Sequence, residues 1–551
     1  MHDSDDSRNK RLTRRRRRPS LMLLATAGLT TLLALGCSQP AAAPSSATAG
    51  GSAQETPKPG GILDTAFAIV EALDLEPLQH TSSAYANLTG KSYNGLIQFD
   101  PIGNTKIIPE LAERWDISPD GQTYTFYLHK GIKWHDGVSF TAADVKYTLD
   151  RMRDPNDLFV ADLRNKGESL AAVTQVDIVD DNTVRLVLSR PSNSLLAFLA
   201  YGSNMIVPKH AYEQGKDMGK TVLGTGPFKL SNYQQGAVFR LVRNPDYFIK
   251  DRPYLDGINI YFLKDDATRV AAFTTGQIKL LGYIYKPQVD SIKKDMPQAV
   301  ISTMDGLRNG FIGFNVEKPP FTDGRVRQAI SLAMDRQAAL NVLTPEEGEL
   351  GTLLSPSLSE FTQGELSKLP GYRADKTQDL AEAKRLLADA GYPNGFKATL
   401  MTLNSSQDYQ DLAVFGKDQL KKIGIDVTVN VLNNAQYSSE RTRGDFEMIA
   451  TVGTLSFLDP SAGTSYFGPL NFMRWKDQNF QDLLTRQDAV QNPAERKKLV
   501  RQMEQRWLDQ APYAMLYWKT HNAAMYPEVR GYEIGIGLYN TKRFQDVWLA
   551  Q

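Results

Sequence analysis

A chain of 551 residues is too long for a single hydrophobic core, so it must form at least two domains. Its 63 basic and 62 acidic residues nearly balance, and 41% of the chain is hydrophobic. This composition is typical of a globular protein, and it excludes a disordered chain and a protein that binds nucleic acid through an overall positive charge.

The first 36 residues have the parts of an export signal. Arg14 to Arg18 form an unbroken basic run, and a 15-residue apolar stretch extends from Leu21 to Leu35. That stretch is shorter than the roughly 20 residues of a membrane-spanning helix. We therefore predict a cleaved signal peptide over residues 1–36, with a nucleic-acid or nuclear-targeting patch as the alternative for the arginines.

Cys37 is the only cysteine, which excludes an intramolecular disulfide. Leu33 to Cys37 resembles a bacterial lipobox, with small Gly36 before the cysteine and Ala34 where leucine is usual. We predict that Cys37 carries lipid; the alternative is a free thiol in a discarded leader. Residues 38–59 are mostly Ser, Ala, Pro, Gly, Thr and Gln, so residues 37–59 are predicted to be a lipidated cysteine and a disordered linker that spans about 25 Å.

From Gly60 onward the pattern is mixed α/β, richer in strands in the first half. Apolar alternation predicts strands at Tyr124–Leu128, Val184–Leu188 and Ile258–Phe262. Further elements are predicted by periodicity and capping residues: helices after Thr141, after Asp323, from about Asp379, over Asp408–Lys422 and after Asn492, and a strand over Asp426–Leu432.

The search for reactive groups favours binding over catalysis. The six histidines include no pair three or four residues apart, so the sequence contains no local metal site and we predict neither metal nor cofactor. Ser291 and Lys294 form a Ser-x-x-Lys pattern that chance alone explains, and they are the basis of an alternative as an envelope hydrolase. No phosphate-binding loop or nucleophile elbow occurs. We predict that the protein is not an enzyme.

The most specific stretch runs from Pro109 to Arg151, PELAERWDISPDGQTYTFYLHKGIKWHDGVSFTAADVKYTLDR. It resembles the signature region of the extracellular solute-binding proteins of family 5, which include dipeptide, oligopeptide and nickel binders. Later segments resemble the same family in the same order, among them Gly224–Leu230, Asn244–Phe248, Phe314–Ile330, Ala383–Gly395 and Pro512–Tyr517. The resemblance extends from about Gly60 to the C-terminus.

The resemblance implies a two-lobed α/β periplasmic-binding-protein fold of type II, similar to cluster C, with an extra domain inserted in the first lobe. Mapped onto this chain, it gives lobe I as residues 60–96, 222–310 and 520–551, the inserted domain as 97–221, and lobe II as 311–519. A ligand that touches both lobes would shift the equilibrium between open and closed forms toward closure.

The resemblance also implies a function as the binding component of an ABC importer. The protein would be an exported monomer, at the periplasm or outer face of the envelope, anchored by Cys37, that delivers a peptide or other amphipathic solute to permease subunits and their ATPase. A nickel or metallophore binder with His80 near the cleft, and a ligand-binding partner of a sensor, remain the alternatives.

Ligand contacts are expected where family cleft positions fall in this sequence. In peptide-binding relatives an aspartate three residues before an Asp-Pro pair holds the ligand's α-amino group; here that position is Ser456, before Asp459-Pro460. Because a hydroxyl supplies no counter-charge for a buried ammonium, we expect a solute without a free amine unless Asp459 reaches it. The predicted ligand-binding residues are Ser82, Tyr85, Tyr283, Tyr285, Leu455, Ser456, Asp459 and Tyr517.

Overall fold

The computed structural model describes residues 56–68, 74–78, 87–101, 106–154, 157, 168–404, 407–455, 458–464, 471–535 and 543–550. The predicted signal peptide, Cys37 and most of the linker lie outside these ranges, as do His80, Ser82, Tyr85 and Ser456. No helix within the described ranges is long and apolar enough to cross a bilayer.

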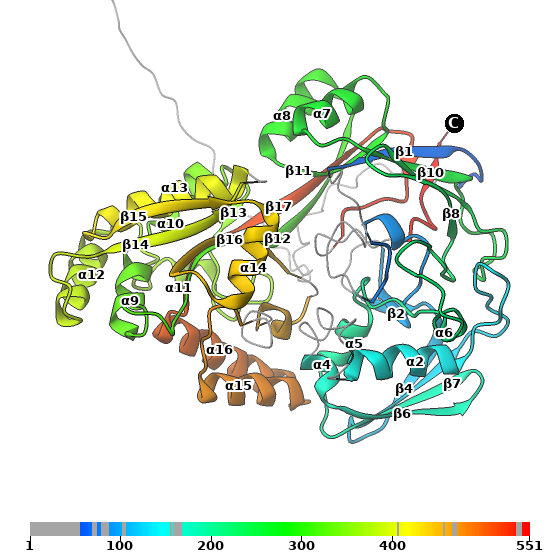
Figure 1. Cartoon of the computed structure of the whole chain (residues 1–551), viewed down its shortest axis with the longest axis horizontal. Helices are drawn as coiled ribbons and strands as arrows, with labels where there is room; N and C mark the ends of the chain where they lie inside the picture. The colour runs from blue at the N-terminus through cyan, green and yellow to red at the C-terminus, as the bar shows by residue number, and fades with distance from the viewer. Residues whose placement is uncertain are drawn as a thin grey trace, which may run out of the picture. The chain divides into compact units, whose positions relative to one another are not determined.

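One eleven-stranded mixed sheet organises the described part of Pro57–Gln551, which forms a single unit (Figure 1). Its strand order is β15-β14-β16-β12-β17-β11-β1-β10-β9-β8, and β13 pairs with β17. The strands are β1 (Ile62–Phe67), β8 (Phe228–Gln234), β9 (Val238–Arg243), β10 (Gly257–Phe262), β11 (Leu280–Ile284), β12 (Val300–Phe314), β13 (Gly348–Glu349), β14 (Lys397–Leu403), β15 (Asp426–Leu432), β16 (Met448–Thr454) and β17 (Tyr513–Met525).

Two long strands, β12 and β17, join the halves of this sheet. The first residues of β12 pair with the last residues of β17, beside β11, and residues 308–314 of β12 pair with β16. Between these stretches the pairing of β12 with β17 shifts register between Met304 and Arg308. Such an interruption of the regular pairing changes the direction in which neighbouring side chains point. The two halves are named below the β8–β11 half and the β14–β16 half.

Helices cover both faces of the β14–β16 half. One face packs against the apolar sides of α9, α10, α12 and α13, and the opposite face against α14, α15 and α16. These helices are α9 (Gly324–Ala333), α10 (Arg336–Leu343), α12 (Thr377–Asp389), α13 (Gln407–Lys421), α14 (Asn434–Arg443), α15 (Gln478–Ala489) and α16 (Pro493–Gln510). A short helix α11 (Gln363–Leu366) and a 3₁₀ turn (Pro460–Thr464) lie in the connecting segments.

The β8–β11 half is covered differently. Helices α7 (Asp266–Thr274) and α8 (Lys286–Asp295) pack on one face, with Phe273, Ile292 and Ala524 in the core between them. The opposite face forms a core with the segments around Tyr93 and Phe544. Close to that second segment, β18 (Val529–Arg530) pairs with β19 (Trp548–Leu549).

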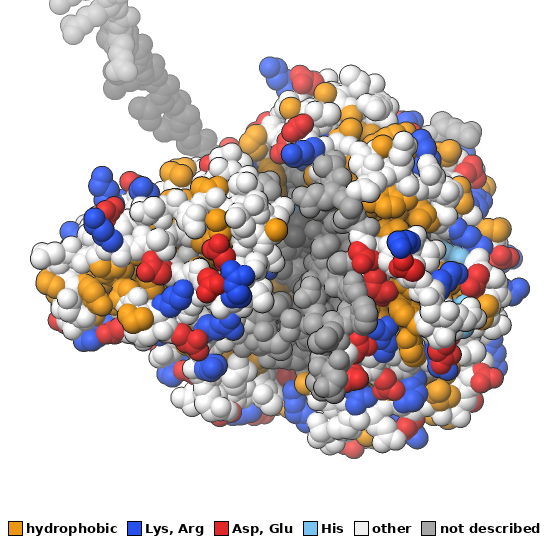
Figure 2. Space-filling view, viewed as in Figure 1, with side chains coloured by type: hydrophobic (Ala, Val, Ile, Leu, Met, Phe, Trp, Pro, Cys, Tyr) orange, Lys and Arg blue, Asp and Glu red, His pale blue; other side chains and the backbone are white. Residues whose placement is uncertain are grey.

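A separate four-stranded antiparallel sheet, in the order β4-β5-β7-β6, has its own core with α2 (Figure 1). Its elements and the short ones beside it are β2 (Ile97–Phe99), β3 (Ile107–Pro109), β4 (Ala112–Ile117), β5 (Thr123–Leu128), α2 (Ala142–Arg153), α4 (Glu168–Ala171), β6 (Val173–Asp180), β7 (Thr183–Leu188), α5 (Leu195–Leu199) and α6 (Lys209–Glu213). On the face shown in Figure 2, basic and acidic side chains are interspersed, as the balanced composition predicts.

The local sequence predictions are confirmed. The three predicted strands are β5, β7 and β10, and the strand predicted over Asp426–Leu432 is β15. Thr141 and Asp144 form the predicted capping box of α2, and Asn492 caps α16. The helix predicted from Asp379 begins two residues earlier, at Thr377. Each of these signals is local, because a cap or an apolar period is complete within one turn or strand.

Candidate functional site

The register shift in β12 lies where the two halves of the sheet meet, and it brings charged side chains together. Asp408, at the start of α13, accepts a hydrogen bond from Lys519 Nζ at 3.0 Å, and its Oδ2 lies 3.0 Å from Arg308 Nη2. Arg308 stands on β12 and Lys519 on β17, so three distant segments meet here. With Tyr285 and His521, these residues are named the crossing cluster.

The cations of the crossing cluster are buried. The side chain of Arg308 is 9% exposed and that of Lys519 4%, against 21% for Asp408. Burial opposes ionisation of Asp408, but Arg308 and Lys519 outweigh it and hold its pKa below the ordinary value. Burial, reinforced by Arg308, lowers the pKa of Lys519 although Asp408 opposes that shift. The three groups therefore depend on one another for charge compensation.

His521 lies beside this charged group and stays neutral. Its ring packs edge-on against Tyr283, with centroids 5.9 Å apart, and lies 6.2 Å from the ring of Tyr285. Burial, together with Arg308 and Lys519, lowers the pKa of His521 to about 3. Both ring nitrogens are buried and have no hydrogen-bond partner among the described residues. The Nε of Arg308 is likewise buried and has no hydrogen-bond partner among the described residues.

Tyr285 forms an aromatic wall for the two cations. Lys519 Nζ lies 4.2 Å from the centroid of its ring, and the guanidinium carbon of Arg308 lies 5.6 Å from it. These are favourable cation–π distances. Burial raises the pKa of Tyr285 to about 12, so its hydroxyl keeps its proton at neutral pH.

A groove of about 740 Å³ opens beside the crossing cluster, with walls from both halves of the sheet. Tyr285, Asp408 and Lys519 line it together with Glu347. One wall comes from α7 and α8 and the other from the ends of α10 and α13. The volume suits a small organic molecule. Ser291, the nucleophile of the hydrolase alternative, is an exposed residue of the same lining.

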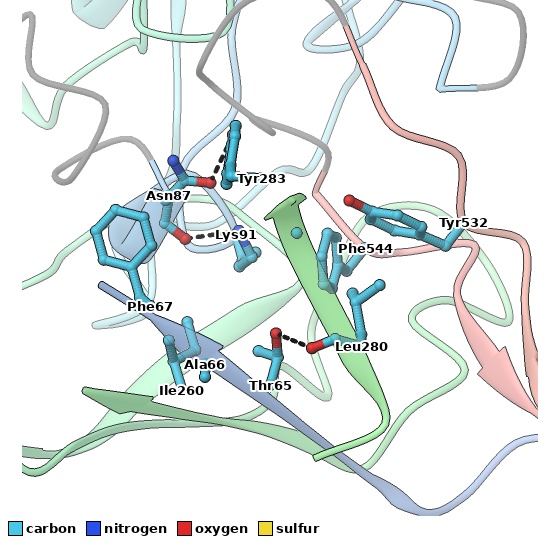
Figure 3. Close-up of a pocket in the computed structure, with 11 residues that line it drawn as sticks. Thr65, Ala66, Phe67, Asn87, Lys91, Ile260, Leu280, Tyr283, Tyr532 and Phe544 are labelled. Atoms are coloured by element: carbon cyan, nitrogen blue, oxygen red, sulfur yellow. Dashed lines mark hydrogen bonds between the residues drawn. The ribbon is translucent and has the colours of Figure 1, made fainter. Parts of the chain in front are cut away.

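A second, smaller cavity of about 40 Å³ lies on the β8–β11 half (Figure 3). Lys91 lines it, donates to the backbone oxygen of Asn87 at 2.7 Å, and lies 4.5 Å from the ring centroid of Phe544. Burial and the nearby Arg543 lower the pKa of Lys91 to about 7. Tyr283 donates to Asn87 Oδ1 at 3.3 Å in the same lining. Tyr283 therefore links this cavity to His521.

Tyr283 has a left-handed backbone conformation, with φ of +58°. A bulky residue rarely adopts this region, and such strain concentrates at functional sites. It coincides with the register irregularity of β11 against β17, between Leu281 and Ile284. Tyr283 and Tyr285, on either side of Ile284 in the sequence, both pack against the ring of His521.

The described residues predicted as ligand contacts fall in different places. Tyr283 and Tyr285 come together around His521 and line the two cavities. Tyr517 is buried, its ring covers Gly310, and burial and Asp408 raise its pKa. Leu455 lies in the hydrophobic core that includes α15 and α16. These four positions remain predicted contacts.

Asp459 makes its own ion pair within the β14–β16 half. Its two oxygens accept from Arg496 Nη2 at 2.9 and 2.7 Å, and Oδ1 also accepts from the backbone N–H of Ser461 at 2.9 Å. A ligand ammonium would have to compete with Arg496 for this carboxylate. The sequence prediction did not include Lys91, Arg308, Asp408, Lys519 or His521. Within the described residues, no group of three or more His, Cys, Asp or Glu residues is arranged to hold a metal ion.

A continuous sheet whose halves are joined by two long strands, with a polar groove where the halves meet, defines a two-lobed periplasmic binding protein. Residues 106–472 match the model of the bacterial extracellular solute-binding proteins, family 5 (middle region). The chain belongs to this family, as its sequence motifs predicted. It is therefore a substrate-binding protein of ABC importers, exported from the cytoplasm, and not an enzyme.

Similar proteins bind chemically different ligands. The chain is 30% identical over 479 residues to heme-binding protein A of Haemophilus influenzae, covering 82% of this chain and 86% of that protein. The structure of AgaA from A. tumefaciens R10 in complex with agropinic acid matches with a TM-score of 0.79 and 27% identity, over 89% of this chain and 99% of that one. DppA from Helicobacter pylori in complex with peptide STSA matches with a TM-score of 0.78 and 27% identity, over 90% and 99%.

Proposed function

We propose that this protein captures a small amphipathic organic solute between its lobes and delivers it to an ABC permease as a monomer tethered through lipidated Cys37. The observation that carries the proposal is the groove beside the crossing cluster, because its lining comes from both halves of the sheet. A solute that contacts both walls binds the closed form better and therefore favours closure.

The proposed division of the chain follows the path of the two long strands. Lobe I comprises residues 60–96, 222–310 and 520–551, the inserted domain residues 97–221, and lobe II residues 311–519. The boundaries near residues 310 and 519 lie on β12 and β17, close to the register shift of the crossing. Bending at this place would leave the packed cores on either side intact.

The ligand is proposed to be a peptide-sized solute that is not held by an α-ammonium group. Peptides and agropinic acid, a non-peptide ligand, both occupy similar proteins. The carboxylate that would hold an ammonium is replaced by Ser456, and Asp459 already pairs with Arg496. Opine-like acids and peptides with a blocked or absent amine fit these charges better than free dipeptides do.

The test uses full-length protein, produced in a bacterium that exports it. Native mass spectrometry identifies co-purified solutes, and a thermal-shift screen compares peptides, N-blocked peptides, opine-type acids, sugars and nickel chelates. Stabilisation by one chemical class with micromolar affinity supports the proposal. Absence of both a co-purified solute and stabilisation across the whole screen would contradict it.

A further inference from the structure

The four-stranded domain is attached to the β8–β11 half by a buried ion pair. Glu110, two residues before β4, accepts a hydrogen bond from Arg543 Nε at 2.6 Å, and neither side chain is more than 3% exposed. Glu110 also accepts from the backbone N–H of Gly95 at 2.7 Å and from the side-chain amide of Asn94 at 2.8 Å. Separating Glu110 from Arg543 would leave a buried charge without compensation, which is strongly unfavourable. The four-stranded domain is therefore expected to move together with the β8–β11 half.

Hydrogen bonds also join the four-stranded domain to α15 of the β14–β16 half. The side-chain amide of Asn193 donates to the backbone oxygens of Gln487 at 3.2 Å and Val490 at 2.8 Å. Its backbone N–H donates to the backbone oxygen of Asp488 at 2.8 Å. The carboxylate of Asp488 accepts from three residues of the same segment, Arg190, Ser192 and Ser194. Residues 190–194 and 487–490 are named the inter-lobe latch.

The chain path does not enforce this contact. The chain enters the four-stranded domain after Tyr93 and returns through Val222, and both residues lie in the core of the β8–β11 half. Among the described residues, the apolar part of the contact with the core around α15 and α16 consists of Ala197, Phe99 and Ile107, the last two only partly buried. Water can replace the hydrogen bonds of the latch when the parts separate, and polar contacts of this kind are typical of domains that move relative to each other.

Arg496 connects the latch to Asp459, one of the predicted ligand-binding residues. Its Nε donates to the backbone oxygen of Gln487 at 3.2 Å and to the side-chain oxygen of the same residue at 3.1 Å. Its Nη2 donates to the two oxygens of Asp459 at 2.9 and 2.7 Å. The backbone oxygen of the buried Gln487 thus accepts from Asn193 on one side and from Arg496 on the other. A continuous chain of hydrogen bonds therefore runs from the four-stranded domain to the predicted ligand loop.

We propose that the inter-lobe latch forms when the lobes close and breaks when they open, and that Gln487 and Arg496 couple it to the position of Asp459. A rotation of the β14–β16 half about β12 and β17 moves α15 away from Asn193, because the four-stranded domain stays with the β8–β11 half. No described residue of the latch lines the groove beside the crossing cluster. The latch therefore favours closure by the same amount for every solute. This inference rests on the proposed function, because it concerns closure of the lobes around a solute.

The first experiment measures the latch without any solute. Full-length protein with Cys37→Ser contains no cysteine, so nitroxide labels can be attached at Lys130→Cys in the four-stranded domain and at Lys498→Cys on α16, two exposed positions. Pulsed electron paramagnetic resonance gives the distribution of distances between the labels. The ratio of the shorter to the longer distance population is the ratio of latched to open molecules.

Two substitutions of Asn193 weaken the latch. Asn193→Ala removes both side-chain hydrogen bonds to α15, so the ratio of latched to open molecules should fall about 10- to 30-fold. Asn193→Asp keeps the size of the side chain but turns an oxygen toward the two carbonyl groups, so the ratio should fall further. Gln175→Ala, in the same domain, removes an exposed hydrogen bond to Asp177 and is the matched control, which should stay within about 2-fold of the wild-type ratio.

The second experiment relates the latch to binding. Calorimetry with agropinic acid and with N-acetyl-Met-Leu should show that Asn193→Ala weakens both affinities by one common factor, which the measured fraction of latched molecules sets. Native-state hydrogen exchange follows the amides of Ser461 and Ala462, which donate to Asp459. These amides should exchange at least about 3-fold faster in Asn193→Ala. In an Arg496→Lys background, where one amine replaces the two donors, Asn193→Ala should add no further acceleration.

The outcomes separate the latch from the function on which it rests. If both Asn193 variants keep a latched ratio within about 2-fold of the Gln175→Ala control, or if the two solutes are weakened by factors that differ more than about 3-fold, the latch is refuted and the binding function stands. Unchanged exchange at Ser461 and Ala462 in Asn193→Ala would refute the coupling through Arg496. If no solute of the screen binds to protein with a native circular dichroism spectrum, the proposed function fails, while the label distances still decide whether the latch opens.

Discussion

Asp488 joins the four-stranded domain to the β14–β16 half. It stands near the end of α15, and its Oδ2 accepts from Arg190 Nη1 at 2.8 Å and from Ser192 Oγ at 2.9 Å. Its Oδ1 accepts from the backbone N–H of Ser194 at 2.9 Å. The side chain is 7% exposed, so these bonds are shielded from solvent. This carboxylate holds the segment between β7 and α5 together with Asn193, which donates to the backbone oxygens of Gln487, Asp488 and Val490.

We expect Asp488→Asn to destabilise the protein by about 2–3 kcal/mol. The asparagine keeps the shape of the side chain but loses the charge that pairs with Arg190. Its NH₂ group also replaces an oxygen that accepted hydrogen bonds, so it meets a donor where an acceptor is needed. Hydrogen bonds to charged groups contribute about 1.5–3 kcal/mol each, and Arg190, at 30% side-chain exposure, regains some water on losing its partner. The predicted loss is therefore below the roughly 3–5 kcal/mol for breaking a fully buried pair.

Urea unfolding followed by circular dichroism measures this loss. The matched control is Asp482→Asn on the same helix. Among the described residues its carboxylate accepts a hydrogen bond only from Gln478, at an exposed position, so the substitution should cost under about 0.5 kcal/mol. If Asp488→Asn changes the free energy of unfolding by no more than this control, the argument that the carboxylate holds the two parts together is wrong. A separate early transition in the variant would show that the four-stranded domain has been released.

Three further outcomes are expected. The folded-state pKa of His521, about 3, lies below its unfolded value of 6.5, so its contribution to stability is present above pH 6.5 and is lost as pH falls. Between pH 6.5 and 5 the wild-type protein should lose about 1.5 kcal/mol that a His521→Gln variant does not lose, as urea unfolding at each pH would measure. Gly310→Ala would place a Cβ 2.3 Å from Tyr517 Cζ and should cost about 1–3 kcal/mol, whereas Gly282→Ala meets nothing within 4 Å; equal unfolding midpoints would contradict this. Cys37→Ser should abolish labelling by a fatty-acid analogue and move the protein from the membrane fraction to the soluble fraction; retention at the membrane would disprove the anchor.

The sequence predicted elements well where the signal is local. Thr141 and Asn492 identify helix starts because a cap needs only the two or three following N–H groups. The family and its two-lobed fold were predicted because the Pro109–Arg151 motif extends over one connected segment. The division into lobes is still a prediction, since it depends on the residues at which β12 and β17 pass from one lobe to the other.

The charged part of the site could not be predicted in the same way. Asp408 and Lys519 are 111 residues apart, and no spacing rule links an acidic helix start to a lysine on a distant strand. One signal was present: Lys519 and His521 interrupt a strand that is otherwise largely apolar and is buried throughout its length. Buried charges of this kind require partners, so they mark a site before its geometry is known.

The charges near the predicted ammonium-binding position bear on the chemistry of the ligand. The family resemblance predicts an ammonium-binding position at Ser456, which carries no charge, and the neighbouring Asp459 is neutralised by Arg496. Where β12 and β17 join the two halves of the sheet, Asp408 forms ion pairs with Arg308 and Lys519, and Glu347 also attracts Lys519. A hydroxyl at position 456 supplies no counter-charge for a ligand ammonium, and this disfavours a cationic group there. The scaffold motifs carry no information on the charge of the ligand, because they fix turns and cores.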